Sequence, residues 1–162
     1  MQTDRARSRV EQMVEAMASR GHRVTPQRLA ILEVLAKSEG HPTANQVLRR
    51  VQRRFPMVGK ATVYNTIQLL KGLGQVLELE FRDAPNRYDG NTPEPHPHLL
   101  CTQCGRIDEV MNPSLHETAS RVADEVGYEL LSHRFDVYGL CPSCRRKRGP
   151  EGADAESRLL AP

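Results

Sequence analysis

The chain has 162 residues, of which 38% are hydrophobic and 27% charged, a composition typical of one ordinary soluble domain or two small ones. No run of eighteen apolar residues occurs, and charges fall in every turn of the N-terminal segment. These features argue against a membrane span or a secretory signal and predict a cytoplasmic protein. The net charge of +3 is too small to indicate nucleic-acid binding by itself, so any basic face must be local.

Capping patterns mark two helix starts in the first third of the chain. Before them, apolar residues recur at helical spacing over 8–19 and predict a first helix. Thr25-Pro26 combines an N-cap with proline at the first helical position, so a second helix is expected to run to about Lys37. Thr43-Ala-Asn-Gln46 has a capping-box pattern and predicts a third helix.

A fourth helix is expected over the segment GKATVYNTIQLLKGLG. Val63, Ile67 and Leu70 follow the spacing of a buried face, which places polar side chains such as Asn65 on the opposite side. Residues 75–89 alternate in polarity around a turn and predict a β-hairpin. The last three helices and the hairpin together predict a winged helix-turn-helix domain over residues 1–89.

The composition changes after the hairpin, and residues 90–97 predict a hinge. Residues 98–148 then predict a small α/β domain, with short strands at HLLC and RIDEVM, a helix from Ser114, and a long strand over 128–140. The tail, 149–162, lacks periodicity and is expected to be disordered. The expected fold class is therefore α+β.

Four cysteines form two C-x-x-C pairs, Cys101/Cys104 and Cys141/Cys144. Within each pair a two-residue gap lets a tight turn direct both sulfurs at one ion, and four thiolates can complete a tetrahedral Zn²⁺ shell. A closed shell has no position for substrate, so the expected role is structural. The alternative is a set of free or redox-active thiols, as in a thiol-disulfide oxidoreductase.

A second group of candidate ligands contains histidine and carboxylate. His96 and His98 flank a proline that favours extended backbone, so both rings can point to one side. Asp89 ends the expected hairpin, and Glu109 follows the first cysteine pair. A nitrogen and oxygen shell suits Fe²⁺, Mn²⁺ or Zn²⁺. His41, taken alone, is more often a surface or capping residue, and Asp108 and Glu109 are more often the solvated edge of a strand.

These residues together resemble the ferric uptake regulator (Fur) superfamily of metal-dependent bacterial repressors. The matching segments run in order over roughly residues 8 to 148 and are RVTPQRLAIL, HPTA, GKATVYNTIQLL, RYDG, HPHLLCTQCGRIDEV, SHRFDVYGLC and CPSC. Within the superfamily, ATVYN, the wing LELEFRDAPNRYD and the two cysteine pairs are most similar to the peroxide-responsive repressor (PerR) branch.

The resemblance implies a transcriptional repressor, not an enzyme, that controls oxidative-stress or metal-homeostasis genes. It implies a homodimer in which each winged helix reads half of a palindromic operator in double-stranded DNA, while residues 98–148 form the dimerisation domain around structural zinc. The implied ligands of the regulatory Fe²⁺ or Mn²⁺ are His41, Asp89, His96, His98 and Glu109. In the peroxide-responsive branch, the histidines at the positions of His41 and His96 are oxidised.

Two features depart from that branch. It has aspartate where this chain has Glu109, as iron-uptake regulators do, and Asp108 could replace Glu109 only if the strand register shifted. One additional residue also separates Asp89 from His96. These departures leave open the alternative of an iron- or manganese-uptake regulator that senses metal only. His133 is interpreted as structural or as a weak accessory ligand.

The expected recognition helix supplies the candidate DNA contacts. In a helix-turn-helix protein its N-terminal residues approach base edges in the major groove. Lys60 is expected to meet phosphate, Thr62 and Tyr64 to contact thymine methyl groups, and Asn65 to pair with adenine. Near the start of the second helix, Arg23 and Arg28 are further candidates for phosphate or minor-groove contact. The alternative is a winged helix that contacts protein.

Overall fold

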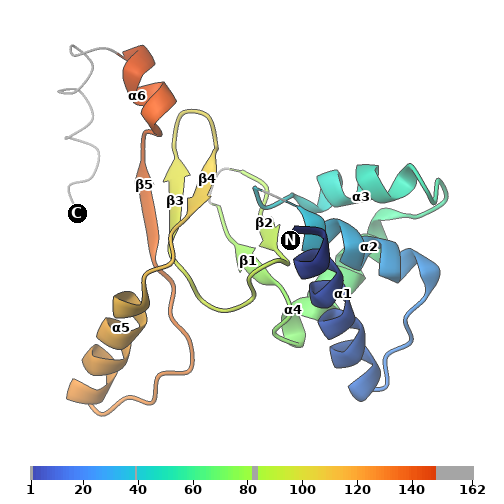
Figure 1. The fold of residues 1–162 in the computed structure, drawn as a ribbon, viewed down its shortest axis with the longest axis horizontal. Helices are drawn as coiled ribbons and strands as arrows, with labels where there is room; N and C mark the ends of the chain where they lie inside the picture. Colours follow the sequence, from blue (N-terminus) through green and yellow to red (C-terminus); the bar gives the residue numbers. More distant parts are fainter. Residues whose placement is uncertain (1, 39, 82–83, 149–162) are drawn as a thin grey trace. The chain divides into compact units, whose positions relative to one another are not determined.

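The computed structural model describes residues 2–38, 40–81 and 84–148 (Figure 1). The chain divides into two compact units between Pro95 and His96, inside the segment expected to be a hinge. The predicted tail, 149–162, lies outside the described residues. No helix in the described part of the chain is both long enough and apolar enough to cross a membrane.

The N-terminal unit, up to Pro95, is a winged helix-turn-helix preceded by one further helix (Figure 1). Its elements in order are α1 (Gln2–Ser19), α2 (Pro26–Lys37), α3 (Ala44–Gln52), α4 (Lys60–Gly72), β1 (Leu77–Leu79) and β2 (Arg87–Asp89). Strands β1 and β2 pair antiparallel, with Glu78 opposite Tyr88. Helix α1 begins earlier than the predicted residue 8, and Asp4 in its first turn suits the positive end of the helix dipole.

Both predicted caps form. The Thr25 side chain accepts a hydrogen bond from the Arg28 backbone N–H over 3.3 Å at the start of α2. At the start of α3, Thr43 Oγ1 accepts from the Gln46 N–H over 3.2 Å, while the Thr43 N–H donates to Gln46 Oε1 over 2.8 Å. This reciprocal pair satisfies two N–H groups that the first helical turn leaves without a partner in the helix.

The core of the N-terminal unit lies among its four helices. Buried apolar side chains come from each of them: Met13 and Met17 of α1, Ile31, Leu32 and Leu35 of α2, Val47 and Val51 of α3, and Val63, Ile67 and Leu70 of α4. Val63, Ile67 and Leu70 therefore form the predicted buried face of α4, which holds the opposite face of that helix at the surface.

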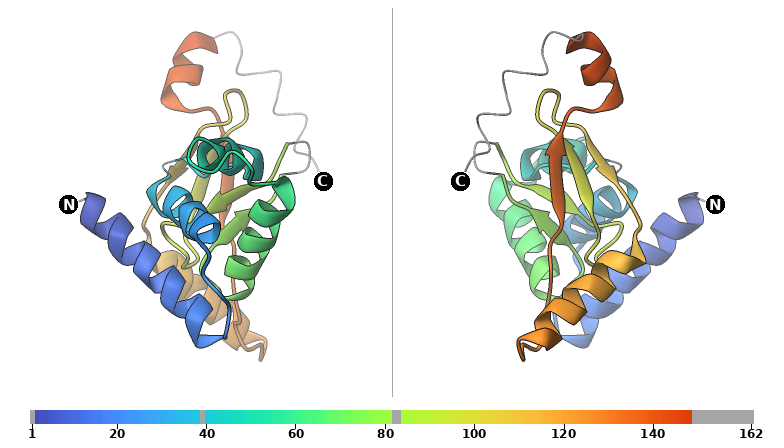
Figure 2. Two further views of the ribbon diagram at one scale, coloured as in Figure 1. Left: turned by 90° about the vertical axis from the view of Figure 1, so that its right-hand side faces the viewer. Right: turned by 90° about the vertical axis from the view of Figure 1, so that its left-hand side faces the viewer.

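The described part of the C-terminal unit, residues 96–148, contains a three-stranded sheet and two helices (Figure 2). Its elements are β3 (His98–Cys101), β4 (Ile107–Glu109), α5 (Pro113–Glu125), β5 (Asp136–Gly139) and α6 (Pro142–Arg148). The strand order is β4-β3-β5, with β4 antiparallel and β5 parallel to β3. The α+β fold class is thus confirmed.

The prediction of a long strand over 128–140 is wrong, because only residues 136–139 form a strand. The carbonyl of Phe135 still accepts a hydrogen bond from the His98 N–H over 3.1 Å. The strand β3 itself begins at His98, so the described residues before Phe135 have no strand partner in this sheet. The helix α6 was also not predicted, although Pro142 occupies a position that proline favours at a helix start.

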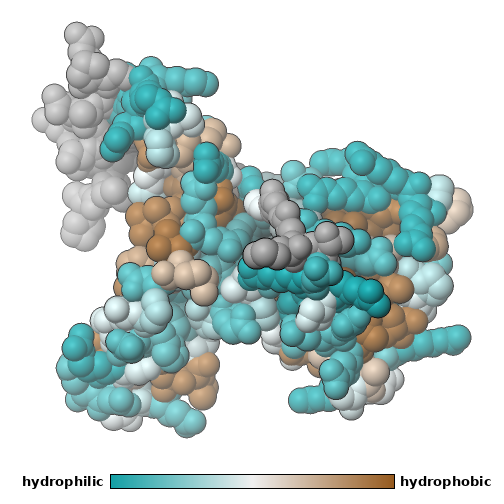
Figure 3. Space-filling model, viewed as in Figure 1, coloured by the Kyte–Doolittle hydropathy of each residue, from teal (hydrophilic) through white to brown (hydrophobic). Residues whose placement is uncertain are grey.

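The C-terminal unit leaves apolar surface uncovered. No residue of α5 is buried; Val122 on this helix and Val126, which caps its C-terminus, are 56% and 68% exposed. With Tyr128 and Phe135 of the segment leading to β5, they help to line a groove of about 450 Å³. Hydrophobic residues are visible over this part of the unit in Figure 3.

Candidate metal centres

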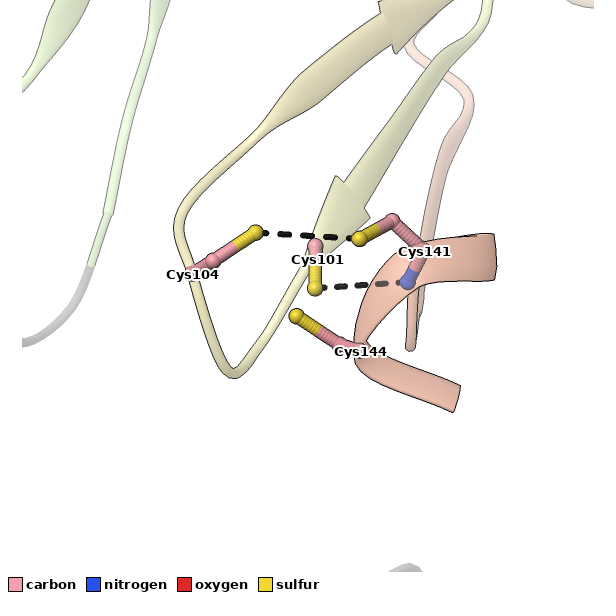
Figure 4. Close-up of side chains that lie close together, drawn as sticks. All are labelled: Cys101, Cys104, Cys141 and Cys144. Carbon is pink, nitrogen blue, oxygen red and sulfur yellow. Dashed lines mark hydrogen bonds between the residues drawn. The ribbon is translucent and has the colours of Figure 1, made fainter. Parts of the chain in front are cut away.

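The four cysteines of the two C-x-x-C pairs meet in the C-terminal unit (Figure 4). Their sulfur atoms all lie within 4.8 Å of one another, and the Sγ atoms of Cys104 and Cys141 are 3.7 Å apart. A tetrahedral zinc site with Zn–S bonds of about 2.3 Å requires sulfur–sulfur distances of about 3.8 Å. The spacing is much longer than a disulfide bond of about 2 Å. The cluster therefore fits a structural zinc ion.

Tight turns hold the sulfurs in place. The turn after β3 closes with a hydrogen bond from the Gly105 N–H to the Cys101 carbonyl over 2.9 Å, and Gly105 has a positive φ of 69° that favours glycine. The second pair lies at the start of α6, where the Cys141 N–H donates to Cys101 Sγ over 3.3 Å. This backbone N–H favours the thiolate form of Cys101 and lowers the pKa of Cys101.

Electrostatics within the cluster also favour a bound cation. The Ser143 hydroxyl and the Cys144 backbone N–H stabilise the Cys141 thiolate and lower the pKa of Cys141 to about 6. The pKa of Cys144 is raised to about 12, chiefly by its interaction with the Cys141 sulfur and then by burial. Four thiolates at this spacing repel one another, and a divalent cation at their centre offsets that repulsion.

The N-terminal unit brings His41 and Asp89 together. Their Nε2 and Oδ2 atoms are 3.6 Å apart, and both residues are 3% exposed. The contact arises because the residues after His41 join the wing: the Tyr88 N–H donates to the Pro42 carbonyl over 3.0 Å, and Thr43 forms a β-bridge with Arg87. His41 has a φ of 54°, a left-handed conformation that is uncommon for a residue other than glycine.

Asp89 is held as a carboxylate. Burial opposes its ionisation, but the close approach of His41 and the hydrogen bond from the backbone N–H of Thr92 outweigh that effect and lower the pKa of Asp89. Its Oδ1 atom accepts from the N–H groups of Asn91 and Thr92 over 2.8 and 3.1 Å. Oδ2 remains directed at His41.

The C-terminal unit brings His96 and His98 onto one side, as their spacing predicts. Their ring centroids are 4.3 Å apart, and the residues are 6% and 2% exposed. Glu109 lies directly opposite His98 on the antiparallel strand β4, and its Oε2 is 3.7 Å from His96 Nε2. Cross-strand partners share one face of a sheet, so Glu109 lies on the histidine face.

Asp108, by contrast, lies opposite Leu99 and accepts a hydrogen bond from Arg106 Nε over 2.8 Å at the surface. The register therefore makes Glu109 the carboxylate of the histidine face. Imidazole and carboxylate donors of this kind fit Fe²⁺ or Mn²⁺. A further carboxylate, Asp136, lies beside His98 with an Oδ1–Nδ1 distance of 3.6 Å. Sequence reasoning missed Asp136, because no local pattern relates it to His98.

The exposed face of α4 carries most of the candidate DNA contacts. Lys60 and Asn65 are exposed, Tyr64 is 42% exposed, and Thr62 is half-buried. At the base of α2, Arg28 Nη1 donates to the Arg23 carbonyl over 2.8 Å, which brings these two arginines together. His116 and His133 also approach each other, with ring centroids 5.2 Å apart, but neither belongs to the two donor groups above.

The wing is tied to α4 by one carboxylate. Glu78 of β1 accepts hydrogen bonds from Lys71 Nζ, from Asn86 Nδ2 over 2.8 Å and from the Tyr88 hydroxyl over 3.2 Å. Burial alone raises the pKa of Glu78, but the hydrogen bonds from Lys71 and Asn86 outweigh it and lower the pKa. The position of the hairpin next to α4 therefore depends on the charge of Glu78.

A winged helix together with a tetrathiolate cluster and imidazole–carboxylate donors defines a class of metal-binding winged-helix proteins. Within that class, the chain belongs to the ferric uptake regulator family, whose profile matches residues 19–138.

The chain is 37% identical to the peroxide operon regulator of Bacillus subtilis (strain 168), over 85% of this chain and 94% of that protein. It is 36% identical to the peroxide-responsive repressor PerR of Staphylococcus aureus (strain USA300), over 85% of this chain and 93% of that protein. Among solved structures, it matches a zinc-bound manganese uptake regulator with a TM-score of 0.60 at 32% identity, covering 80% of this chain and 98% of that chain.

Proposed function

We propose that this chain is a cytoplasmic, metal-dependent transcriptional repressor that binds DNA and responds to peroxide. The observation that carries this proposal is the 37% identity with a peroxide operon regulator over 85% of the chain, in a molecule that retains donors for two different metals. Family members are transcriptional regulators and not enzymes, so peroxide is a signal here and not a substrate that the protein turns over.

The tetrathiolate cluster takes the structural role in this proposal. Cys101, Cys104, Cys141 and Cys144 hold Zn²⁺ and join the turn after β3 to the start of α6. Because the C-terminal unit has little buried apolar surface of its own, its folding depends on this ion. The closed shell leaves no ligand position for a signal.

The regulatory ion is held by residues from both units. His41 and Asp89 are supplied by the N-terminal unit, and His96, His98 and Glu109 by the C-terminal unit. An Fe²⁺ or Mn²⁺ ion that binds all five fixes the distance between the units. Metal binding then favours the arrangement of the two units that binds metal over other arrangements. By linkage, if that arrangement also matches the spacing of two DNA half-sites, metal binding raises the affinity for DNA.

The repressor reads DNA as a homodimer. Lys60 contacts phosphate, Tyr64 and Asn65 read base edges with support from Thr62, and Arg23 and Arg28 add backbone contacts. The exposed apolar groove beside α5 supports dimerisation through the C-terminal unit, since a second copy would cover it. Two-fold symmetry then predicts a palindromic operator.

Peroxide sensing requires a reaction of the protein with itself. A bound Fe²⁺ would supply the redox chemistry that activates peroxide and would be unchanged over the whole reaction. In that balance one hydrogen peroxide oxidises the ring of His41 or His96 by two electrons: one oxygen atom enters a ring C–H bond, and the other leaves as water. Both rings lie beside a carboxylate of the site, at 3.6 Å and 3.7 Å. An oxidised ring is a poorer ligand, so metal is lost and the DNA is released.

The second candidate is an iron- or manganese-uptake regulator that senses metal only. Glu109 favours it, because the strand register places this glutamate, and not Asp108, on the histidine face. The match to a manganese uptake regulator at 32% identity also supports it. In this alternative, the five ligands bind and release the metal ion reversibly, and no residue is oxidised.

Operator binding by zinc-replete protein separates the two candidates. The protein is loaded with Fe²⁺ or Mn²⁺, DNA binding is measured before and after brief exposure to hydrogen peroxide, and peptides are analysed by mass spectrometry. The peroxide reading predicts that only the Fe²⁺ form releases DNA, with one added oxygen atom on His41 or His96. The exposed His22 and His116 serve as internal controls. Release of metal and DNA without any such addition supports the metal-only regulator.

A further inference from the structure

Asp136 lies next to one of the proposed regulatory ligands. His98 of β3 and Asp136 of β5 are directly paired across the parallel strands, and their Nδ1 and Oδ1 atoms are 3.6 Å apart. Their side chains are only 2% and 9% exposed. A carboxylate buried beside an imidazole in this way has lost its hydration and requires an interaction within the protein.

The opposite side of the Asp136 carboxylate is held by Arg134. The Arg134 Nε–H donates to Asp136 Oδ2, and the two residues are separated by one position, which places them on the same side of an extended segment. Arg134 remains 40% exposed on its side chain, whereas Asp136 Oδ1 is buried and accepts no hydrogen bond from the described residues. The carboxylate therefore has one oxygen on a surface guanidinium and the other facing the His98 ring.

We infer that Asp136 is a positioning residue that selects the tautomer and ring orientation of His98. With its Nδ1–H directed at Asp136, the neutral ring presents Nε2 as its donor to a metal ion. Histidine ligands commonly donate their other N–H to a carboxylate in this manner, and removal of that carboxylate typically weakens metal binding by about 10- to 100-fold. A small rotation of the ring shortens the 3.6 Å separation to a hydrogen bond.

This inference deepens the proposed function and rests on it in one respect, because it assumes that His98 is a ligand. It adds a residue outside the five proposed ligands. It also gives Arg134 a role, since the guanidinium fixes the carboxylate that fixes the imidazole. A purely structural ion pair between Arg134 and Asp136 would leave His98 unaffected by changes at Asp136.

The test uses the full chain, zinc-replete and at pH 8, as wild type, Asp136→Asn and Asp136→Ala. The exposed Asp124 of α5 provides the matched control variant Asp124→Ala. Mn²⁺ affinity is measured by titration. Asp136→Ala is expected to weaken binding by about 10- to 100-fold, and Asp136→Asn by less because its amide oxygen still accepts the Nδ1–H. Asp124→Ala should match the wild type, and zinc content verifies that each variant is folded.

A second measurement does not depend on Mn²⁺. The ring nitrogens of His98 are observed by NMR in the protein without regulatory metal. Wild type and Asp136→Asn should carry the proton on Nδ1, whereas Asp136→Ala should shift it toward Nε2. Unchanged Mn²⁺ affinity and an unchanged tautomer in Asp136→Ala would overturn the inference. If the wild type binds no Mn²⁺, the proposed regulatory site fails, and the NMR result still decides whether Asp136 selects the tautomer.

Discussion

The guanidinium of Arg9 in α1 donates a hydrogen bond to the backbone carbonyl of Gln75 over 2.6 Å, just before the wing begins. Its other terminal nitrogen donates to the Gln75 side chain over 2.8 Å and to Gln12 over 3.1 Å. Arg9 is 5% exposed, so α1 is attached to the DNA-reading fold by a buried cation that sequence periodicity does not reveal.

Replacement of Arg9 by methionine is expected to lower the free energy of unfolding by about 1–3 kcal/mol, because the partly buried carbonyl and side chain of Gln75 lose their donor. Arg9→Lys should recover only part of this loss, since an ammonium group cannot reproduce the fork-shaped set of donors. Urea unfolding measures both. Arg7, whose side chain is 83% exposed in its pair with Glu11, is the control. Arg7→Met should cost at most about 0.5 kcal/mol, and an equal loss in both variants would contradict this account of Arg9.

Gly90 is expected to tolerate no side chain. A Cβ atom there would lie 2.8 Å from Leu35 Cβ and 3.1 Å from both the Leu35 backbone and Met13 Cε. Gly90→Ala should therefore destabilise the N-terminal unit by about 1–3 kcal/mol. Gly72 in α4 has open space around it, and Gly72→Ala should be neutral or stabilise the helix by about 0.5–1 kcal/mol. Thermal unfolding of the two alanine variants compares them directly.

The charge of Glu78 makes wing stability depend on pH. Its pKa is lower in the folded chain, so its contribution is present above the ordinary value of 4.5 and is lost as the pH falls through the folded value. The pKa of Lys71 is raised, so its contribution disappears only above 10.5. Glu78→Gln should cost about 1 kcal/mol at neutral pH. The difference in unfolding free energy between Glu78→Gln and wild type should vanish in acid, where Glu78 is protonated. A difference that stays constant from neutral to acid pH would show that the negative charge of Glu78 does not stabilise the wing.

Zinc removal should unfold the C-terminal unit while the N-terminal unit keeps its own apolar core. The measurement is circular dichroism with thiol titration before and after a strong chelator. One tightly held zinc and four protected thiols per chain are expected beforehand. Cys104→Ser should lose zinc, whereas His98→Ala should retain it. Thiols that react fully while the fold persists would favour the thiol-disulfide oxidoreductase.

Replacement of Tyr64 and replacement of Lys60 should change DNA binding in different ways. Tyr64→Ala is expected to reduce discrimination between operator and unrelated DNA by about 1–3 kcal/mol, because it loses a base contact. Lys60→Ala should weaken all sequences alike and reduce the salt slope by about one unit. Binding to both DNAs at several salt concentrations provides the comparison. Equal loss of discrimination in both variants would contradict the assignment.

Local sequence signals predicted the caps of α2 and α3, the buried face of α4 and the cysteine cluster, because each depends on spacing within one segment or on matched pairs. The limits of β5 could not be predicted in this way. They depend on where the neighbouring strand β3 begins, at His98, and strand pairing is a non-local property. The same holds for Asp136, which meets His98 only through the register of β5 against β3.

The register also resolved a choice that the sequence left open. Asp108 and Glu109 are adjacent, and alternation along a strand places them on opposite faces. Only the pairing of Glu109 with His98 shows which of the two faces the histidines. The carboxylate proposed to bind the regulatory metal is therefore longer by one methylene than that of the peroxide-responsive branch that the chain resembles.

The left-handed backbone of His41 limits which substitutions could remove this proposed metal ligand without straining the fold. At a φ of 54°, glycine and asparagine are accommodated with little strain, whereas β-branched residues are not. A repressor that has escaped regulation at this position should therefore carry asparagine or glycine there, with its wing and recognition helix intact. Valine or isoleucine at the same position would also add backbone strain of about 1–2 kcal/mol, so the two kinds of change should differ in the stability of the N-terminal unit.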